Sequence, residues 1–145
     1  MRTLYIDAGW TSIGYCVYDS GVRGDSGEFH YSQKDKIARL RSISLDLRKL
    51  IKAEFVEKIV CEDYKIFGRI GANGQNVLLM IGCLIEICNA CDIRMDLVNF
   101  NHWKAIWKRL DKKPYFDEMR DHEKDASMMG YVLESPTVEA CDDVF

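Results

Sequence analysis

The chain opens with Thr-Leu-Tyr-Ile-Asp at residues 3–7 and Ser-Ile-Gly-Tyr-Cys-Val-Tyr-Asp at residues 12–19. Runs rich in β-branched and aromatic residues predict strands. The first run ends on Asp7, and Gly9 and Gly14 flank the turn between the two runs. A third strand is expected over residues 27–32, after the turn region at 21–27. Three successive strands joined by short turns predict an antiparallel meander.

Helices and strands alternate along the rest of the chain. Apolar residues at spacings of three and four predict a helix over residues 37–51, and a short apolar run at 56–61 predicts a buried strand that closes on Glu62. A glycine-rich loop at 68–74 precedes a helix over 75–91 and a strand over 95–99. Asn101 is expected to cap a short helix, and two further helices are expected over 121–133 and from Val138. The order predicts one α/β domain spanning residues 1–145.

Composition and charge set limits on function. The 145 residues are 48% hydrophobic, which is typical of a folded globule, and the net charge of −3 argues against a general nucleic-acid binder. The charges are separated, however. Basic residues gather in segments 34–52 and 104–113, while acidic residues gather at 117–125 and near the C-terminus. Such a bipolar surface can bind DNA locally.

The apolar segments and cysteines predict a soluble, intracellular protein. The longest apolar stretch, residues 77–91, contains Glu86 and Asn89 and is short for a membrane span, and no leader is expected at the start. Six cysteines lie mostly in apolar runs, as reduced core cysteines do. The apolar band of the 75–91 helix is wider than one buried stripe, so one face is expected on the sheet and another on a partner subunit in a homodimer.

Four acidic residues stand where they could form one cluster. Asp7 and Glu62 each end a strand, and Glu139 and Asp142 are three residues apart on an expected helix. Taken singly, each could be an ordinary turn or surface residue. Together they would repel one another unless divalent cations neutralised them, and oxygen ligands favour Mg²⁺ or Mn²⁺ over zinc. Two such ions can promote phosphodiester hydrolysis.

These segments resemble the RuvC family of Holliday-junction resolvases. The stretch Asp-Ala-Gly-Trp-Thr-Ser-Ile-Gly-Tyr at 7–15 resembles the first family motif, and Ile-Val-Cys-Glu at 59–62 resembles the second. Glu-Ala-Cys-Asp at 139–142 resembles the C-terminal acidic pair, and Glu123-Lys124 resembles the segment that supplies a catalytic basic residue. The resemblance implies an RNase H-like fold, with a five-stranded mixed sheet in which three antiparallel strands are joined by two parallel ones. The short chain and its cysteines resemble a viral branch, such as phage or poxvirus resolvases.

The resemblance also implies a homodimer that holds two Mg²⁺ (or Mn²⁺) ions per active site and makes paired symmetric nicks across a four-way DNA junction. The implied metal ligands are Asp7, Glu62, Glu139 and Asp142, with Asp143 as a substitute for Asp142. Lys124 is implied to stabilise charge at the scissile phosphate. The residues expected to contact DNA are Phe67, Arg69, Lys104, Lys108, Arg109, Lys112 and Lys113.

Three other functions fit parts of the same sequence. A nuclease of the same fold could act on another branched DNA or a structured RNA, since the fold does not set the substrate. The pattern Asp7-x-Gly9-x-Thr11-Ser12 also resembles a phosphate-binding motif of actin-like sugar kinases, but those proteins need two such domains. A non-catalytic junction-binding protein would gain nothing from carboxylates that face phosphate.

Overall fold

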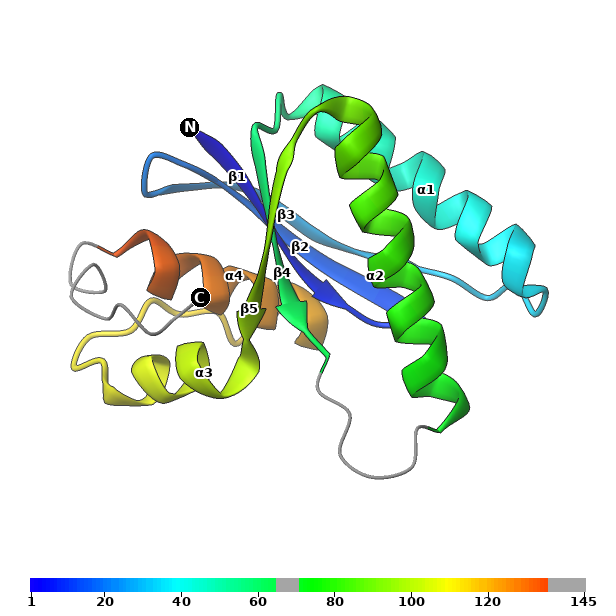
Figure 1. The fold of residues 1–145 in the computed structure, drawn as a ribbon. Helices are drawn as coiled ribbons and strands as arrows, with labels where there is room; N and C mark the ends of the chain where they lie inside the picture. The colour runs from blue at the N-terminus through cyan, green and yellow to red at the C-terminus, as the bar shows by residue number, and fades with distance from the viewer. Residues whose placement is uncertain (65–70, 136–145) are drawn as a thin grey trace.

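A twisted sheet forms the centre of the molecule (Figure 1). The computed structural model describes residues 1–64 and 71–135, and these contain one five-stranded sheet in the order β3-β2-β1-β4-β5. Strands β1, β2 and β3 are antiparallel neighbours, whereas β4 and β5 run parallel to β1. The predicted mixed sheet is therefore confirmed. The strands are β1 (Arg2–Ala8), β2 (Ser12–Asp19), β3 (Val22–His30), β4 (Lys58–Asp63) and β5 (Arg94–Asn99).

Helices cover both faces of this sheet (Figure 1). Helices α1 (Lys36–Ala53) and α2 (Ala72–Cys91) lie on one face, and α3 (Phe100–Arg109) and α4 (Asp121–Glu134) lie on the other. Because side chains alternate along a strand, each strand contributes to two cores. Leu4 and Ile6 of β1 pack in the core with α1 and α2, while Tyr5 between them packs in the core with α3 and α4.

Strand β3 and helix α3 begin at other residues than the sequence-based expectation gave. Strand β3 begins at Val22 instead of residue 27, because Ser20 and Gly21 both have positive φ and form a two-residue hairpin turn. Helix α3 begins at Phe100, and its cap is Asn99, whose side-chain oxygen accepts a hydrogen bond from the Asn101 backbone N–H at 3.0 Å. Asn99 therefore both ends β5 and caps α3, so no separate loop precedes the helix.

Helix α2 begins three residues earlier than predicted, at Ala72. Its segment Asn73–Cys91 is long and apolar enough to cross a membrane by composition, with a mean hydropathy of 1.4. In the structure, Met80, Leu84 and Ile87 are at most 1% exposed and pack against the sheet. These contacts are those of a core helix.

Helix α4 lies unusually close to the sheet because small residues stand at its contact points. A Cβ added at Gly14 of β2 would lie 2.0 Å from the His122 carbonyl carbon and oxygen. A Cβ added at Gly130 of α4 would lie 2.4 Å from the Tyr18 ring, and the Tyr18 hydroxyl donates to the Ser127 carbonyl at 3.0 Å. Gly14 pairs with Asp7 across β1 and β2, so the first turn of α4 passes directly over the end of β1.

This close approach predicts a strong effect of Gly14→Ala. The methyl group would meet the helix backbone, which cannot rotate away, so α4 must shift and the free energy of unfolding should fall by about 2 kcal/mol or more. Urea denaturation measures this change. Gly24→Ala is the matched control, since its Cβ would lie 3.5 Å from the Val17 carbonyl oxygen, an ordinary contact. Equal stability of the two variants would contradict the close packing of α4.

Candidate active site

Two carboxylates meet at the carboxyl ends of the adjacent parallel strands β1 and β4. The register pairs Ile6 with Cys61, so the next residues, Asp7 and Glu62, lie side by side at one edge. Tyr5 lies on the α3 and α4 side of the sheet, and alternation places Asp7, two residues later, on that same side. Val60 of β4 also lies on the α3 and α4 side, so Glu62, two residues later, lies on that side as well. The structure thus brings together the two acids that the sequence placed at strand ends.

Glu62 is held in a largely buried setting by an indole from α3. The Trp103 Nε1–H donates a hydrogen bond to Glu62 Oε2 at 3.2 Å, and Trp103 itself is fully buried. Burial raises the pKa of Glu62 to about 7, and the nearby carboxylates of Asp7 and Asp125 act in the same direction. The ammonium of Lys104 and the Trp103 hydrogen bond partly oppose this rise.

Asp7 has a direct partner in α4. His122 Nδ1 lies 2.6 Å from Asp7 Oδ2, and the Asp7 side chain is only 15% exposed. The hydrogen bond with Asp7 raises the pKa of His122, while burial of the ring acts against the rise. Protonation of this imidazole offsets part of the negative charge at this edge of the sheet. Sequence analysis did not single out His122, although its spacing from Ala126 and Met129 places it on the buried face of α4.

Lys104, expected to contact DNA, and Lys124, expected to stabilise charge at the scissile phosphate, differ in their surroundings. Lys104 Nζ lies 3.0 Å from Asp125 Oδ2 and 4.2 Å from the centre of the Phe100 ring. Its positive charge acts to lower the pKa of Glu62. Lys124 instead forms an ion pair with Asp117. Lys104 thus stands beside the carboxylates, whereas Lys124 is held by an acid of the segment between α3 and α4.

The other predicted site residues fall into two groups. Within the described residues, no group of three or more histidine, cysteine or acidic side chains is arranged to hold a metal ion, so Asp7 and Glu62 form a pair there. Four basic residues expected to contact DNA are exposed on or just after α3, namely Lys108, Arg109, Lys112 and Lys113. Five expected site residues lie outside the described part of the chain: Phe67, Arg69, Glu139, Asp142 and Asp143.

The two basic segments of the sequence lie on opposite faces of the sheet. Segment 34–52 belongs largely to α1, and segment 104–113 belongs largely to α3. In the first segment Arg39 is buried, stacks on Trp10 at 4.8 Å and donates to the Trp10 carbonyl at 3.1 Å. That arginine anchors the turn after β1. Only the segment on α3 shares a face with Asp7 and Glu62.

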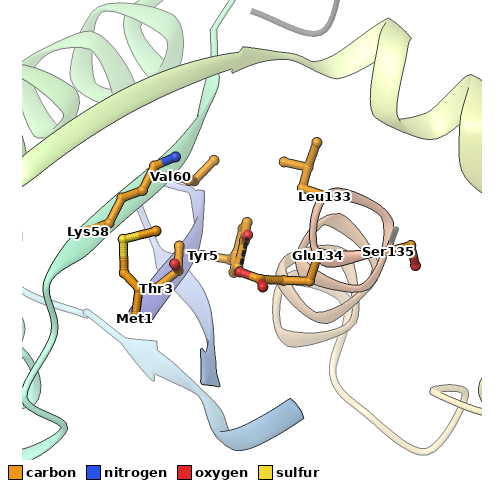
Figure 2. A pocket seen from close by; sticks show the side chains of 8 residues that line it. All are labelled: Met1, Thr3, Tyr5, Lys58, Val60, Leu133, Glu134 and Ser135. Atoms are coloured by element: carbon orange, nitrogen blue, oxygen red, sulfur yellow. Dashed lines mark hydrogen bonds between the residues drawn. The ribbon is translucent and has the colours of Figure 1, made fainter. Parts of the chain in front are cut away.

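A separate cavity of about 220 Å³ lies at the other end of β1 (Figure 2). Thr3 and Tyr5 line one side, and Leu133 and Glu134 at the end of α4 line the other. The Tyr5 hydroxyl donates to Glu134 at 2.8 Å, which fastens the last turn of α4 to the sheet. Since α4 runs antiparallel to β1, the last turn of α4 lies by the start of β1 and the first turn lies by its end. This cavity therefore lies toward the amino end of β1, and the Asp7–Glu62 pair lies at the carboxyl end.

Comparison with known proteins identifies the fold. No protein-family model matches the chain, and no curated protein matches it in sequence. A structure of T. thermophilus RuvC in complex with a Holliday junction substrate is 14% identical, with a TM-score of 0.76 over 99% of this chain and 98% of that one. A second Thermus thermophilus RuvC structure is 14% identical, with a TM-score of 0.71 over 91% of this chain and 92% of that one.

The yeast mitochondrial Holliday junction resolvase Ydc2 is 13% identical, with a TM-score of 0.67 over 91% of this chain and 78% of its own. At these identities the likeness shows the fold alone. The predicted RNase H-like fold, as found in RuvC, is therefore confirmed.

The surroundings of Glu62 predict a pH-dependent stability in the absence of divalent cations. Burial raises its pKa from 4.5 to about 7, so between these values the unfolded chain releases a proton that the folded chain keeps. The contribution of Glu62 to stability therefore falls as the pH rises through this window and stays low above it. Glu62→Gln should unfold at nearly the wild-type temperature at pH 4.5 and about 4 °C above it at pH 8.

Thermal unfolding in EDTA measures this difference. Glu118→Gln, at an exposed site, serves as the control and should follow the wild type at both pH values. A gap between Glu62→Gln and the wild type that is the same at pH 4.5 and pH 8 would contradict the buried setting of Glu62.

Proposed function

We propose that this protein is a metal-dependent endonuclease that resolves four-way DNA junctions by paired symmetric nicks. The observation that carries the proposal is the Asp7–Glu62 pair, set at the carboxyl ends of β1 and β4 on the same face as the basic helix α3. The fold supports it, since both T. thermophilus RuvC and yeast Ydc2 are Holliday-junction proteins by name. An RNase H-like nuclease for another branched or structured nucleic acid is the alternative within the same chemistry.

The donor set at this edge fits a hard divalent cation. Two carboxylates share a partly buried site, where burial favours the neutral form of Glu62. A divalent cation bound there would act in the opposite direction and favour the charged form of both acids. Asp7 and Glu62 would hold Mg²⁺ or Mn²⁺, and Glu139 with Asp142 or Asp143 would complete two sites, as the family resemblance implies. When bound, such ions lower the pKa of water and stabilise the leaving oxygen of a phosphodiester.

The chain's own residues prepare these carboxylates. His122 fixes the orientation of Asp7 through its 2.6 Å hydrogen bond, and Trp103 fixes Glu62 from the other helix. Lys104 keeps a positive charge next to Glu62, where it can approach a phosphate once Asp125 releases it. Lys124 remains the proposed stabiliser of the scissile phosphate, which requires it to leave its ion pair with Asp117.

The exposed basic residues of α3 supply the DNA-binding surface of this proposal. Lys108 and Arg109 end the helix, and Lys112 and Lys113 follow it, all on the face that carries the two acids. Because phosphate contacts release counterions, binding through them should weaken as salt increases. Phe67 and Arg69 remain proposed junction contacts from the family resemblance.

We also propose that the protein is intracellular. The five cysteines in the described part of the chain are all free thiols, and Cys16, Cys61 and Cys88 among them are buried. Free buried thiols favour an intracellular protein. The viral branch of the family likewise remains a prediction.

Asp7→Asn tests the nuclease chemistry. The amide keeps the size of the side chain and can still accept a hydrogen bond from His122, but it removes a charge that a cation requires. Cleavage of a synthetic four-way junction in Mg²⁺ should fall by about a hundredfold or more, a scale typical of losing one electrostatic group at a reaction centre. Junction affinity in EDTA should be unchanged.

Linear duplex and reactions in EDTA serve as controls and should show no cleavage by the wild-type protein. Wild-type cleavage of junctions by Asp7→Asn would remove Asp7 from the mechanism. Equal cleavage of linear duplex and junction would favour a different nuclease substrate.

The outer face of α2 supports the proposed homodimer. Leu78 and Ile85 are 36% and 40% exposed and lie on one stripe with Gly82, beside which the structure leaves open space. An apolar stripe of this kind suits a two-fold contact with a second copy, which would present two active sites to a junction.

The double variant Leu78→Glu/Ile85→Glu should therefore be monomeric by light scattering, whereas the wild type should be dimeric at micromolar concentration. Leu45→Glu on α1, where the leucine is 54% exposed, is the matched control and should stay dimeric. A monomeric wild type would contradict the dimer without affecting the assignment of the carboxylates.

A further inference from the structure

A cavity of about 290 Å³ lies between the second half of α3, the segment that follows it and the first turn of α4. Its lining is both aromatic and basic, and includes Trp107, Tyr115, Phe116, Lys113 and Lys124. The volume is at the small end of the range for small-molecule sites, so it suits a compact planar group. None of the residues assigned so far as metal ligands lines it.

The aromatic side chains of this cavity differ sharply in burial. Trp107 and Phe116 stack on each other with ring centres 5.9 Å apart, and Phe116 is only 5% exposed. Tyr115 is 72% exposed, although it is next to Phe116 in sequence. The stacked pair, of which Phe116 is buried and Trp107 partly buried, thus forms one wall, and the Tyr115 ring is available to stack on a ligand.

Positive charge surrounds the same rings. Lys113 Nζ lies 6.0 Å from the centre of the Trp107 ring and donates to the Lys108 carbonyl at 3.3 Å, so its ammonium is held over the aromatic wall. Lys124 also lines the cavity, where Asp117 forms an ion pair with it. A planar ring with an attached phosphate would match both features, the ring on Tyr115 and the phosphate on Lys113.

The cavity is connected to the carboxylate pair through both helices. Trp103 contacts Glu62, and Trp107, one turn later on α3, lines the cavity, which corresponds to a rise of about 6 Å. On α4, His122 contacts Asp7, and Lys124 two residues later lines the cavity. Along α3, the cavity thus begins one helical turn after the residue that contacts Glu62.

The geometry points to a nucleotide-binding subsite in which one unpaired base of the DNA strand stacks on Tyr115 while Lys113 contacts its phosphate. This inference rests on the proposed nuclease function and adds to it a reason for preferring branched DNA. A base within a duplex is already stacked and cannot enter, whereas a base at a branch point can leave its stack at lower cost. The subsite would select strands that offer an unpaired base near the cut.

The test uses fluorescence anisotropy of labelled oligothymidylate of eight nucleotides, in EDTA so that no cleavage occurs. Tyr115→Ala should weaken binding about tenfold, because it removes the stacking surface, while Tyr115→Phe should stay within about twofold of the wild type. Phe55→Ala is the matched control, since Phe55 is 75% exposed but lies between α1 and β4. Lys113→Gln should lower the salt dependence of binding by about one ion.

An abasic oligonucleotide of the same length separates base stacking from phosphate contact. Tyr115→Ala and wild type should bind it with equal affinity, whereas Lys113→Gln should still bind it more weakly. Equal binding of oligothymidylate by wild type and Tyr115→Ala, or no binding by the wild type, would overturn the subsite. Junction cleavage in Mg²⁺ is measured in parallel. If Tyr115→Ala leaves binding unchanged but the wild type cleaves junctions, the subsite is refuted and the nuclease proposal stands. If base stacking is observed without cleavage, only the nuclease proposal is refuted.

Discussion

Two like charges held next to each other are the constraint around which this fold is arranged. Asp7 and Glu62 lie at the carboxyl ends of neighbouring parallel strands, each one residue before the last, and a shift of either strand by one residue would turn its acid to the opposite face. In a half-buried setting their repulsion is costly unless other groups offset it. His122, Trp103 and Lys104 do so from two different helices.

Those helices can offset the charge only because they lie close to the sheet. Gly14 allows the backbone of α4 to pass over the end of β1, and Gly130 allows the same helix to lie against the Tyr18 ring. Tyr5 then fixes the far end of α4 through Glu134. A glycine in the middle of a strand therefore determines where an imidazole is placed, which links backbone packing directly to the chemistry of the carboxylates.

Charge is distributed by face, so an acidic protein can still present a basic surface on one side of its sheet. The basic residues of α3 share a side of the sheet with Asp7 and Glu62, while α1 carries its basic residues on the other side, where Arg39 has a structural role. The cavity beside Tyr115 lies at the end of α3 and is lined by Trp107, one helical turn after Trp103. A nucleic-acid strand on this side would meet positive charge, an aromatic surface and the two acids in succession.

By itself the sequence determined the order of the elements and the two strand-end acids. Hydrophobic alternation and periodicity are local properties of the chain, and Asp7 and Glu62 each come directly after an apolar run. It also located the basic segment that became α3. It did not reveal the partnership of His122 with Asp7, which spans 115 residues, or the cavity beside Tyr115, whose walls come from two helices and a connection. Such contacts depend on how closely helices approach a sheet, and that distance is decided by packing between residues far apart in the chain.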